Sequence, residues 1–573
     1  MKRIFLALVF LIALLSSCHS PKKTSAESVA IDPYHFSVQK KIICDNGAVV
    51  SAHPLASKVG IEILKQGGNA IDAAIATQLA LAVVYPNAGN IGGGGFMVAR
   101  LADGKLLALD YREMAPSHAD RDMYLDESGN VQAGKSVDGH LASGVPGTVA
   151  GLFASAKFGK LSFQKLIQPA IELAEKGFVL TENEVASFNS IQDDLKRFNT
   201  VMPKFVKNQW KPGDTLVQTD LANTLKRIRD NGEKGFYEGE TARLIIEEMQ
   251  RGGGIITPQD LKNYKAKFRD PHVFDYKGYT IVGMPMPSSG GILVHQMMKM
   301  IENKNISKMN FETAGSIQLM AEVERRAFAD RAEYMGDADF YRVPEKTLVS
   351  DQYLHQRMKD YVAGTAGNSK QIKPGEMQPK ESEQTTHLDV IDKDGNAVSV
   401  TTTLNNSYGS KTVVAGAGFF LNDEMDDFSA KPGVPNIYGA VGGEANAIAP
   451  GKRMLSSMTP TIVLKDNKPY LILGTPGGTT IPTSVFQTLV DILEFDMTTE
   501  DAVYKPKFHH QWLPDTLYME KNFDPSVRDS MEKMGYKINQ RGAIGRTEVI
   551  KVLANRKFEA VADNRGDDHA EGW

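Results

Sequence analysis

Cysteine is nearly absent from this sequence: Cys18 and Cys44 are the only two among 573 residues. Cys18 lies at the end of an N-terminal targeting segment, which leaves Cys44 as the one thiol in the folded part of the chain. The mature protein therefore cannot form an internal disulfide, even in a compartment that would permit one. Its stability must come from packing.

Long apolar runs and clusters of like charge are also missing. After the run Ile4 to Leu15, no stretch approaches the roughly 20 apolar residues that cross a bilayer. The 65 basic and 69 acidic residues give a net charge of −4, without a Lys/Arg run that could follow a phosphate backbone, so nucleic acid is not an expected partner. With 42% hydrophobic residues, the chain can bury a large core, either in several domains or in one large layered α/β unit.

The N-terminus has the pattern of a bacterial export signal. Lys2 and Arg3 precede the apolar run, and Leu15-Ser16-Ser17-Cys18 resembles the lipoprotein signal, in which the cysteine is lipidated and becomes the first mature residue. We expect a signal peptide over residues 1–17, a solvated tether over 18–40, and a location in the cell envelope, periplasmic or exported, with membrane contact only through the lipid. The alternative is an ordinary signal peptide that ends near Ser17.

The ordered part is predicted to begin near Lys41, with a β-hairpin turn at Asp45-Asn46-Gly47. A helix is expected from Pro54 to Gly67, and a second, capped by Asn69, should run to Val84 and be buried against a sheet. Gly92 to Gly95 lacks the Gly-Lys-Ser/Thr of a phosphate loop and predicts close backbone packing before a strand.

Farther along, residues 150–360 alternate amphipathic helices with short loops and predict a helical layer. Residues 366–384 are polar and contain two prolines, which predicts an exposed, mobile segment. A hairpin turning at residues 392–396, strands at 460–464 and 470–473, and a helix over 482–492 should follow.

Thr385 lies where this polar segment meets the first predicted strand. A threonine hydroxyl is a poor nucleophile near neutral pH unless a base lies within hydrogen-bond reach. An α-amino group, with a reference pKa of about 7.7 to 8.0, can be that base, so a threonine at a new N-terminus would carry both groups. Thr385-Thr386 is also an ordinary β-branched pair for the start of a strand, and the pattern alone leaves both interpretations open.

Several motifs, in order along the chain, resemble those of γ-glutamyltransferases, also called glutathione hydrolases. The resemblance covers nearly the whole chain after about residue 40. The segments that carry it are Gly68 to Ala74, Tyr111 to Pro116, Ser143 to Val149, Thr385 to Asn405, Phe428 to Gly433, Leu455 to Met458, Thr475 to Gly478 and Phe508 to Trp512.

This resemblance implies an N-terminal nucleophile hydrolase fold, an αββα sandwich of two stacked, mainly antiparallel sheets between helical layers. It implies self-cleavage between Gln384 and Thr385 into a large subunit, residues 41–384, and a small subunit, residues 385–573, which together form one compact catalytic unit. The freed Thr385 would take a γ-glutamyl group from glutathione or a related amide and transfer it to water or an acceptor amine.

The same resemblance assigns roles to further residues. Thr403 would orient the Thr385 hydroxyl, and the N–H groups of Gly477 and Gly478 would stabilise the oxyanion. The predicted substrate contacts are Arg112, Ser456 and Ser457 for the α-carboxylate, Asn405, Glu424 and Asp427 for the α-ammonium group, and Tyr438 in a lid over residues 432–443. Position 424 is Glu where some bacterial members carry Gln. No cofactor and no metal are implied.

Other functions fit parts of the pattern. An acylase for glutaryl amides or a polyglutamate transferase would share the fold, and a non-catalytic, peptide-binding envelope lipoprotein is the rival from another class. Ser162-x-x-Lys165 lacks the companion motifs of penicillin-interacting enzymes. His509 and His510 point apart on one backbone and are expected to be buried structural residues, not metal ligands.

The lipoprotein interpretation predicts that Cys18→Ser releases the protein from membranes, because the variant has no thiol to lipidate. Fractionation of cells that produce each form checks this, with Ser17→Ala as a control that should stay with the membrane. Membrane association of Cys18→Ser would show that the protein is held there in another way.

Overall fold

The computed structural model describes residues 31–372, 385–434, 436, 439 and 441–573. The predicted signal peptide and most of the tether, with Cys18, Gln384 and Tyr438, lie outside these residues. Residues 32–573 form one unit in which two sheets are stacked face to face.

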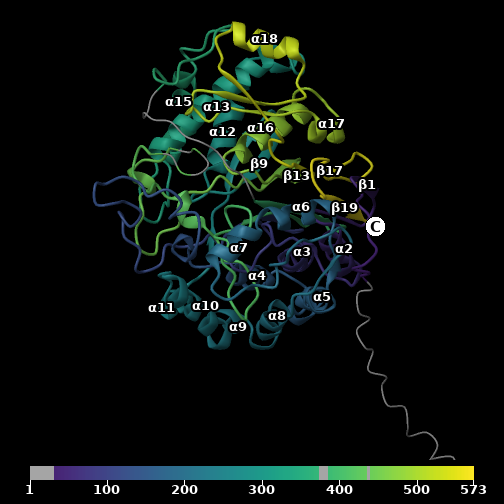
Figure 1. Ribbon diagram of the computed structural model, residues 1–573. Coiled ribbons are helices and arrows are strands. Elements are labelled where there is room, and N and C mark those ends of the chain that lie inside the picture. Colours follow the sequence, from purple (N-terminus) through teal and green to yellow (C-terminus); the bar gives the residue numbers. More distant parts are fainter. Residues whose placement is uncertain (1–30, 373–384, 435, 437–438, 440) are drawn as a thin grey trace, which may run out of the picture. The chain divides into compact units, whose positions relative to one another are not determined.

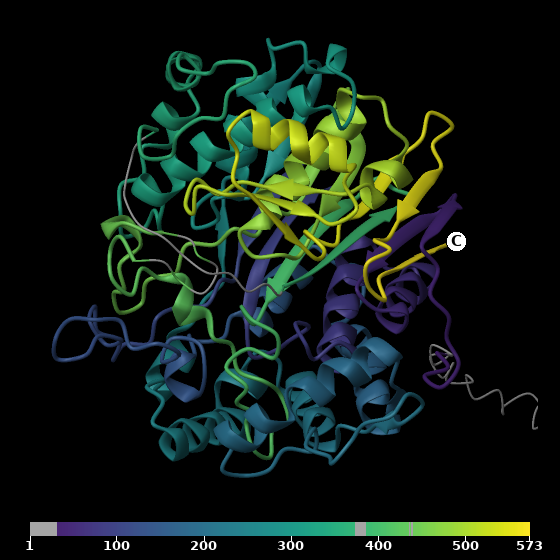
Figure 2. The ribbon, with the colours of Figure 1, turned by 45° about the horizontal axis from the view of Figure 1, so that its top comes forward.

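Sheet 1 carries the strand that begins beside Thr385. Its strands are all antiparallel to their neighbours and run, in spatial order, β19 (His569–Gly572), β2 (Gly47–Ser51), β10 (Thr386–Asp392), β11 (Ala397–Thr403), β3 (Gly94–Arg100), β4 (Leu106–Asp110) and β7 (Lys267–Arg269). Strands from after residue 385, drawn in green in Figure 2, therefore lie in the middle of the sheet, between β2 and β3.

Sheet 2 lies against sheet 1 and mixes distant parts of the chain in the same way. Its antiparallel strands run β1 (Lys41–Cys44), β18 (Phe558–Val561), β17 (Glu548–Val552), β13 (Lys468–Gly474), β12 (Thr461–Lys465), β9 (Tyr279–Gly283) and β8 (His272–Tyr276). Two small sheets are separate, β14 (Phe508–His509), β15 (Leu517–Glu520) and β16 (Ile538–Arg541), and β5 (Phe178–Val179) with β6 (Thr215–Leu216).

Helices cover the outer faces of both sheets (Figure 1). On the side of sheet 1 lie α2 (Pro54–Lys65), α3 (Ala70–Val84), α4 (Thr148–Ala156), α5 (Phe163–Lys176), α6 (Glu182–Ser190), α7 (Gln192–Phe198), α8 (Thr219–Asn231), α9 (Lys234–Tyr237), α10 (Gly239–Gly252) and α11 (Pro258–Asn263). On the side of sheet 2 lie α12 (Gly290–Ile301), α13 (Ala314–Tyr334), α14 (Glu345–Leu348), α15 (Asp351–Arg357), α16 (Thr480–Leu493), α17 (Thr499–Tyr504) and α18 (Pro525–Lys533). The predicted αββα layering is confirmed.

The capped helix and the glycine segment are confirmed as predicted. The Asn69 side chain accepts from the Asp72 N–H at 3.0 Å, and the Asp72 carboxylate accepts from the Asn69 N–H at 2.9 Å, a complete capping box. Every residue of α3 is buried. A Cβ on Gly93 would lie 2.1 Å from the Thr403 carbonyl oxygen, so this strand needs glycine to approach β11.

Two predictions are wrong. Residues 45–47 do not form a hairpin, because β1 pairs with β18 in sheet 2 while β2 pairs with β10 and β19 in sheet 1. The N–H groups of Asp45 and Asn46 bond to the Trp573 carbonyl instead, and the chain crosses between the sheets here. Residues 150–360 are not one helical layer, because they divide between both outer faces and supply β7, β8 and β9 to the sheets.

The space between the two sheets is apolar at one end and polar near Thr385. Val98, Ile472 and Ile550 belong to a common core cluster between the sheets. Toward the start of β10, the buried His387 ring bonds to the hydroxyl of Thr401 at 2.9 Å and to the carboxylate of Asp389 at 3.0 Å. This fixed ring packs directly on the backbone of β13.

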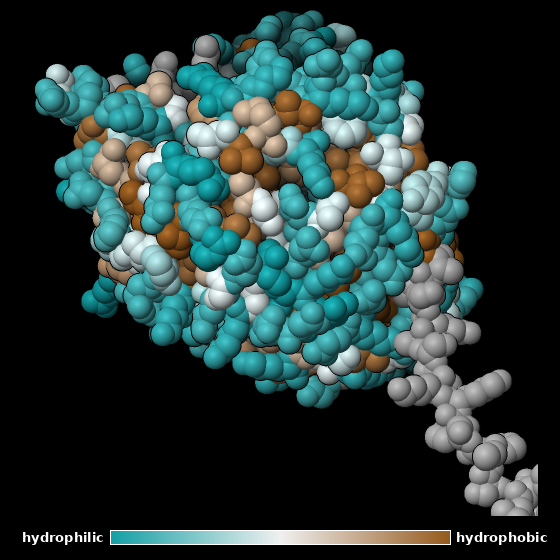
Figure 3. Space-filling model, turned by 60° about the horizontal axis from the view of Figure 1, so that its bottom comes forward, coloured by the Kyte–Doolittle hydropathy of each residue, from teal (hydrophilic) through white to brown (hydrophobic). Residues whose placement is uncertain are grey.

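The face drawn in Figure 3 is mostly hydrophilic, with apolar side chains scattered over it. Within the described residues, the helices are too short or too polar to cross a membrane.

Gly474→Ala should destabilise the fold, because the new Cβ would lie 2.2 Å from the His387 ring, which its hydrogen bonds hold in place. Overpacking of this kind costs about 1 to 3 kcal/mol. We expect a lower urea midpoint for this variant. Gly542→Ala is the control, since a Cβ there meets nothing within 4 Å. Equal midpoints for the two variants would contradict this account of the packing.

Candidate active site

A cavity opens at the end of sheet 1 where β10 begins and β11 ends. The register pairs Thr386 with Thr402, so Thr385 and Thr403 lie side by side at this edge. Both line the cavity, and Thr385 is 4% exposed. The predicted residues that also line it are Arg112, Asn405, Glu424, Asp427, Ser456, Ser457 and Gly478. Residues as distant in the sequence as Arg112 and Gly478 are thus brought around one hydroxyl.

Gly477 and Gly478 form the turn between β13 and α16. Their φ angles are 135° and 54°, backbone conformations that favour glycine. A Cβ on Gly477 would lie 2.5 Å from the Thr480 hydroxyl. Gly478 lines the cavity, whereas Gly477 is not one of its lining residues. The turn leads into the N-terminus of α16, where the helix dipole favours negative charge.

Thr403, the last residue of β11, is held by a residue two positions farther along the chain. Its hydroxyl oxygen accepts from the Asn405 N–H at 2.7 Å, with Asn405 at a φ of 79°. A backbone conformation of this kind is costly for a residue with a side chain. Because the oxygen of Thr403 is already an acceptor, its proton is free to be directed toward another acceptor in the cavity.

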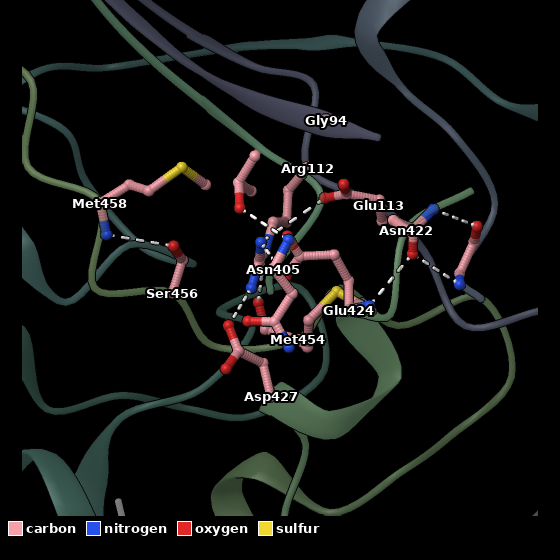
Figure 4. A network of polar contacts seen from close by, with 12 residues as sticks. Gly94, Arg112, Glu113, Asn405, Asn422, Glu424, Asp427, Met454, Ser456 and Met458 are labelled. Atoms are coloured by element: carbon pink, nitrogen blue, oxygen red, sulfur yellow. Dashed lines mark hydrogen bonds and ion pairs between the residues drawn. The ribbon is translucent and has the colours of Figure 1, made fainter. Parts of the chain in front are cut away.

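Arg112 lies in the middle of a buried group of acids (Figure 4). One Nη lies 2.5 Å from Glu424 and 3.5 Å from Glu113, and the other contacts Asp427. The Arg112 guanidinium, predicted to bind a carboxylate of the substrate, thus faces the chain's own acids, including both that were predicted to receive an ammonium group. A carboxylate of a bound molecule would have to join or replace these contacts.

The acids of this group outnumber its cation. Burial raises the pKa of Glu113 to about 8 and raises the pKa values of Glu424 and Asp427 as well, while Arg112 opposes each shift. Glu424 and Asp427 line the cavity, and their raised pKa values mean that Arg112 does not fully offset the cost of burying their charges. A cationic group bound beside them would favour their ionised forms.

Some residues of the cavity were not predicted: Arg331, Asn436, Met458, Thr479 and Ile481. Asn436 donates to the Asp427 carboxylate at 3.2 Å. It belongs to the predicted lid, whose Tyr438 lies outside the described residues. Arg331 is on α13, in a sequence with so many charged residues that it is typical of a solvent-facing helix. Arg331 is nevertheless buried, and no signal in the sequence distinguishes it from the other charged residues of the helix.

His509 and His510 are buried with separate partners, as predicted. His509 bonds to Thr483 and Gln511, both at 2.9 Å, while His510 accepts from the Trp512 N–H at 3.1 Å. Across the described part of the chain, no group of three or more His, Cys, Asp or Glu residues is placed to hold a metal ion.

Arg112→Met should destabilise the protein far more at pH 8 than at pH 5. The change leaves buried acids without their cation, so their folded-state pKa values rise further. A raised carboxyl pKa contributes stability below the unfolded value near 4, and this stability is lost as pH rises through the folded value. At pH 8 we expect a loss of about 3 to 5 kcal/mol from urea unfolding.

The control for this comparison is Arg121→Met, which removes an exposed pair with Glu444. It should cost less than about 1 kcal/mol at either pH. An Arg112→Met penalty that is equal at pH 5 and pH 8 would contradict the charge balance described for the cavity.

Known proteins are similar to this chain along most of its length. The family model described as Gamma-glutamyltranspeptidase matches residues 56–573. The glutathione hydrolase proenzyme of Escherichia coli (strain K12) is 45% identical over 589 residues, with 100% of both chains covered.

Two solved structures are also similar to the chain. The gamma-glutamyltranspeptidase of Helicobacter pylori is 42% identical, with a TM-score of 0.55 over 61% of this chain and 99% of that one. The cephalosporin acylase of Bacillus halodurans is 25% identical, with a TM-score of 0.80 over 95% of this chain and 98% of that one. Because the family model covers most of its length, the chain belongs to the gamma-glutamyltranspeptidase family.

Proposed function

We propose that this γ-glutamyltransferase and glutathione hydrolase uses Thr385 as its nucleophile after cutting its own chain between Gln384 and Thr385. The observation that carries the proposal is the position of Thr385, which lines a cavity together with Gly478, Thr403 and a buried group of acids. Glutathione and related γ-glutamyl amides are the proposed donors.

In the precursor, the Thr385 hydroxyl attacks the carbonyl carbon of Gln384. The acyl group moves from the Thr385 nitrogen to its oxygen, and water hydrolyses the resulting ester. The shift frees the α-amino group of Thr385, and the hydrolysis of the ester returns its hydroxyl. With a reference pKa of about 7.7 to 8.0, this amine can take the hydroxyl proton near neutral pH.

The mature enzyme repeats the attack on its substrate. The Thr385 oxygen adds to the γ-carbonyl of the donor, and the N–H groups of the Gly477-Gly478 turn stabilise the oxyanion at the N-terminus of α16. Thr403 orients the hydroxyl. Collapse releases the amine, which takes a proton, and leaves a γ-glutamyl ester. Water or an acceptor amine then attacks this ester and restores Thr385.

The charged groups of the cavity support an amino-acid donor. Its α-ammonium group would bind Glu424, Asp427 and Asn405, where the excess of acid lies, and its α-carboxylate would bind Arg112, Ser456 and Ser457. A glutaryl amide has no such ammonium group, so it would leave the acids without a cation. This argues against an acylase for glutaryl amides as the main activity.

Two further features belong to the same proposal. The segment 432–443, including Tyr438, would cover the bound glutamyl group, and Asn436 already contacts Asp427 from there. The enzyme would reside in the cell envelope, periplasmic or exported, held by a lipid on Cys18. Its large and small subunits would stay together, because their strands alternate within both sheets.

Thr385→Ala should give one uncut chain that does not hydrolyse a chromogenic γ-glutamyl anilide, because the variant lacks the attacking oxygen for both reactions. Mass spectrometry and an absorbance assay measure the two effects. Thr385→Ser should still be cut. The matched control is Thr386→Ala, which removes the neighbouring buried hydroxyl and should leave a small subunit that begins at residue 385. Two subunits from Thr385→Ala would overturn the proposal.

A further inference from the structure

A second arginine, Arg331, reaches the same cavity from the last turn of α13. It is 7% exposed and lines the cavity with Thr385, Asp427 and Ser457. Its Nε donates to the Ser289 hydroxyl and an Nη donates to the Ser457 hydroxyl, both at 3.1 Å. These bonds hold the guanidinium plane against the wall of the cavity.

Arg331 differs in its partners from three other buried arginines. Arg325 and Arg326 on the same helix contact Glu322, and Arg453 lies 3.3 Å from Asp110. For Arg331, the described residues place no carboxylate within 4 Å, and the hydrogen bonds given above go to neutral hydroxyls. A guanidinium has five N–H donors, so donors remain for another acceptor.

The charges around Arg331 explain why its remaining N–H donors have no carboxylate partner among the described residues. Asp427 is near enough to favour the charged guanidinium, but its carboxylate contacts Arg112. Burial lowers the pKa of Arg331 to about 10, which leaves it a cation at neutral pH. A buried cation without a carboxylate partner is costly unless an anion arrives.

Ser457 indicates where such an anion would lie. Its oxygen accepts from Arg331, so its own proton points away from the guanidinium. Ser457 and Arg331 can therefore donate to one acceptor in the cavity that they both line. A planar carboxylate matches a guanidinium edge together with a hydroxyl.

We propose that Arg331 binds the α-carboxylate of the donor together with Ser457, and that it is a specificity-determining residue for donors that carry this group. The inference rests on the proposed function of the cavity. Arg112 then has two roles, as it neutralises Glu424 and Asp427 and completes the contact with the carboxylate.

The test compares two donors that differ only in this carboxylate: γ-glutamyl p-nitroanilide and 4-aminobutyryl p-nitroanilide. Arg331→Gln should lower kcat/KM for the γ-glutamyl donor about 10- to 100-fold, the range for a charge-assisted hydrogen bond. For the 4-aminobutyryl donor, kcat/KM should change less than about threefold. Arg331→Lys should restore part of the selectivity, because the charge returns without the planar fork.

The control is Arg326→Gln, which removes a buried arginine of the same helix that does not line the cavity. It should lower stability and leave the ratio of the two donors unchanged. Electrophoresis shows whether each variant is cut into subunits, and rates are expressed per cut enzyme. If Arg331→Gln stays uncut, Arg331→Lys carries the comparison.

An equal loss on both donors would show that Arg331 only supports the wall of the cavity, and would overturn the inference. The inference would also be overturned if Arg331→Gln left the ratio of kcat/KM for the two donors unchanged. Failure of the proposed function gives a different result, because wild-type protein would then hydrolyse neither donor, or Thr385→Ala would remain active.

Discussion

The antiparallel pairing of β10 with β11 is the constraint on which the site depends. This pair lies in the middle of sheet 1, and its register brings Thr385 beside Thr403 at one edge. Glycines of the 92–95 segment let β3 approach closely on the other side of β11. A slip of one residue would turn every side chain of β10 to the opposite face. Packing on both sides of the sheet therefore sets the direction of one hydroxyl.

A second constraint is the balance of buried charge. Arg112 alone does not neutralise Glu113, Glu424 and Asp427, and no carboxylate of the described residues lies within 4 Å of Arg331. An α-amino acid carries one charge of each sign. When it binds, its ammonium group can pair with the acids around Arg112, and its carboxylate can pair with Arg331. The cost of burying these groups in the free enzyme is offset by complementarity to that ligand.

Local signals in the sequence predicted the local structure well. Asn69 and Asp72 act within one helix turn, and residues 392–396 turn between strands that pair with each other. The same kind of turn signal at residues 45–47 gave a wrong prediction, because the partners of β1 and β2 lie about 500 and 340 residues away along the chain, beyond the reach of a local pattern.

The site was predictable only in part for a related reason. The family motifs supplied Thr385, Arg112 and the residues around them, whereas composition and periodicity could not. Arg331 was missed because its partners Ser289 and Ser457 lie far along the chain, as Asp515 does for Arg325. A helix of this kind has the same pattern as an exposed one, although tertiary contacts bury it.

The alternation of early and late strands has a consequence for the life of the mature enzyme. Once the chain is cut, neither fragment retains a full sheet, since the later one holds β10 and β11 while the earlier one holds β2 and β3. Reassembly from unfolded fragments would then be a second-order process that depends on their concentration. The uncut precursor can therefore fold as a single chain, whereas a denatured mature enzyme would refold only as fast as its two fragments meet.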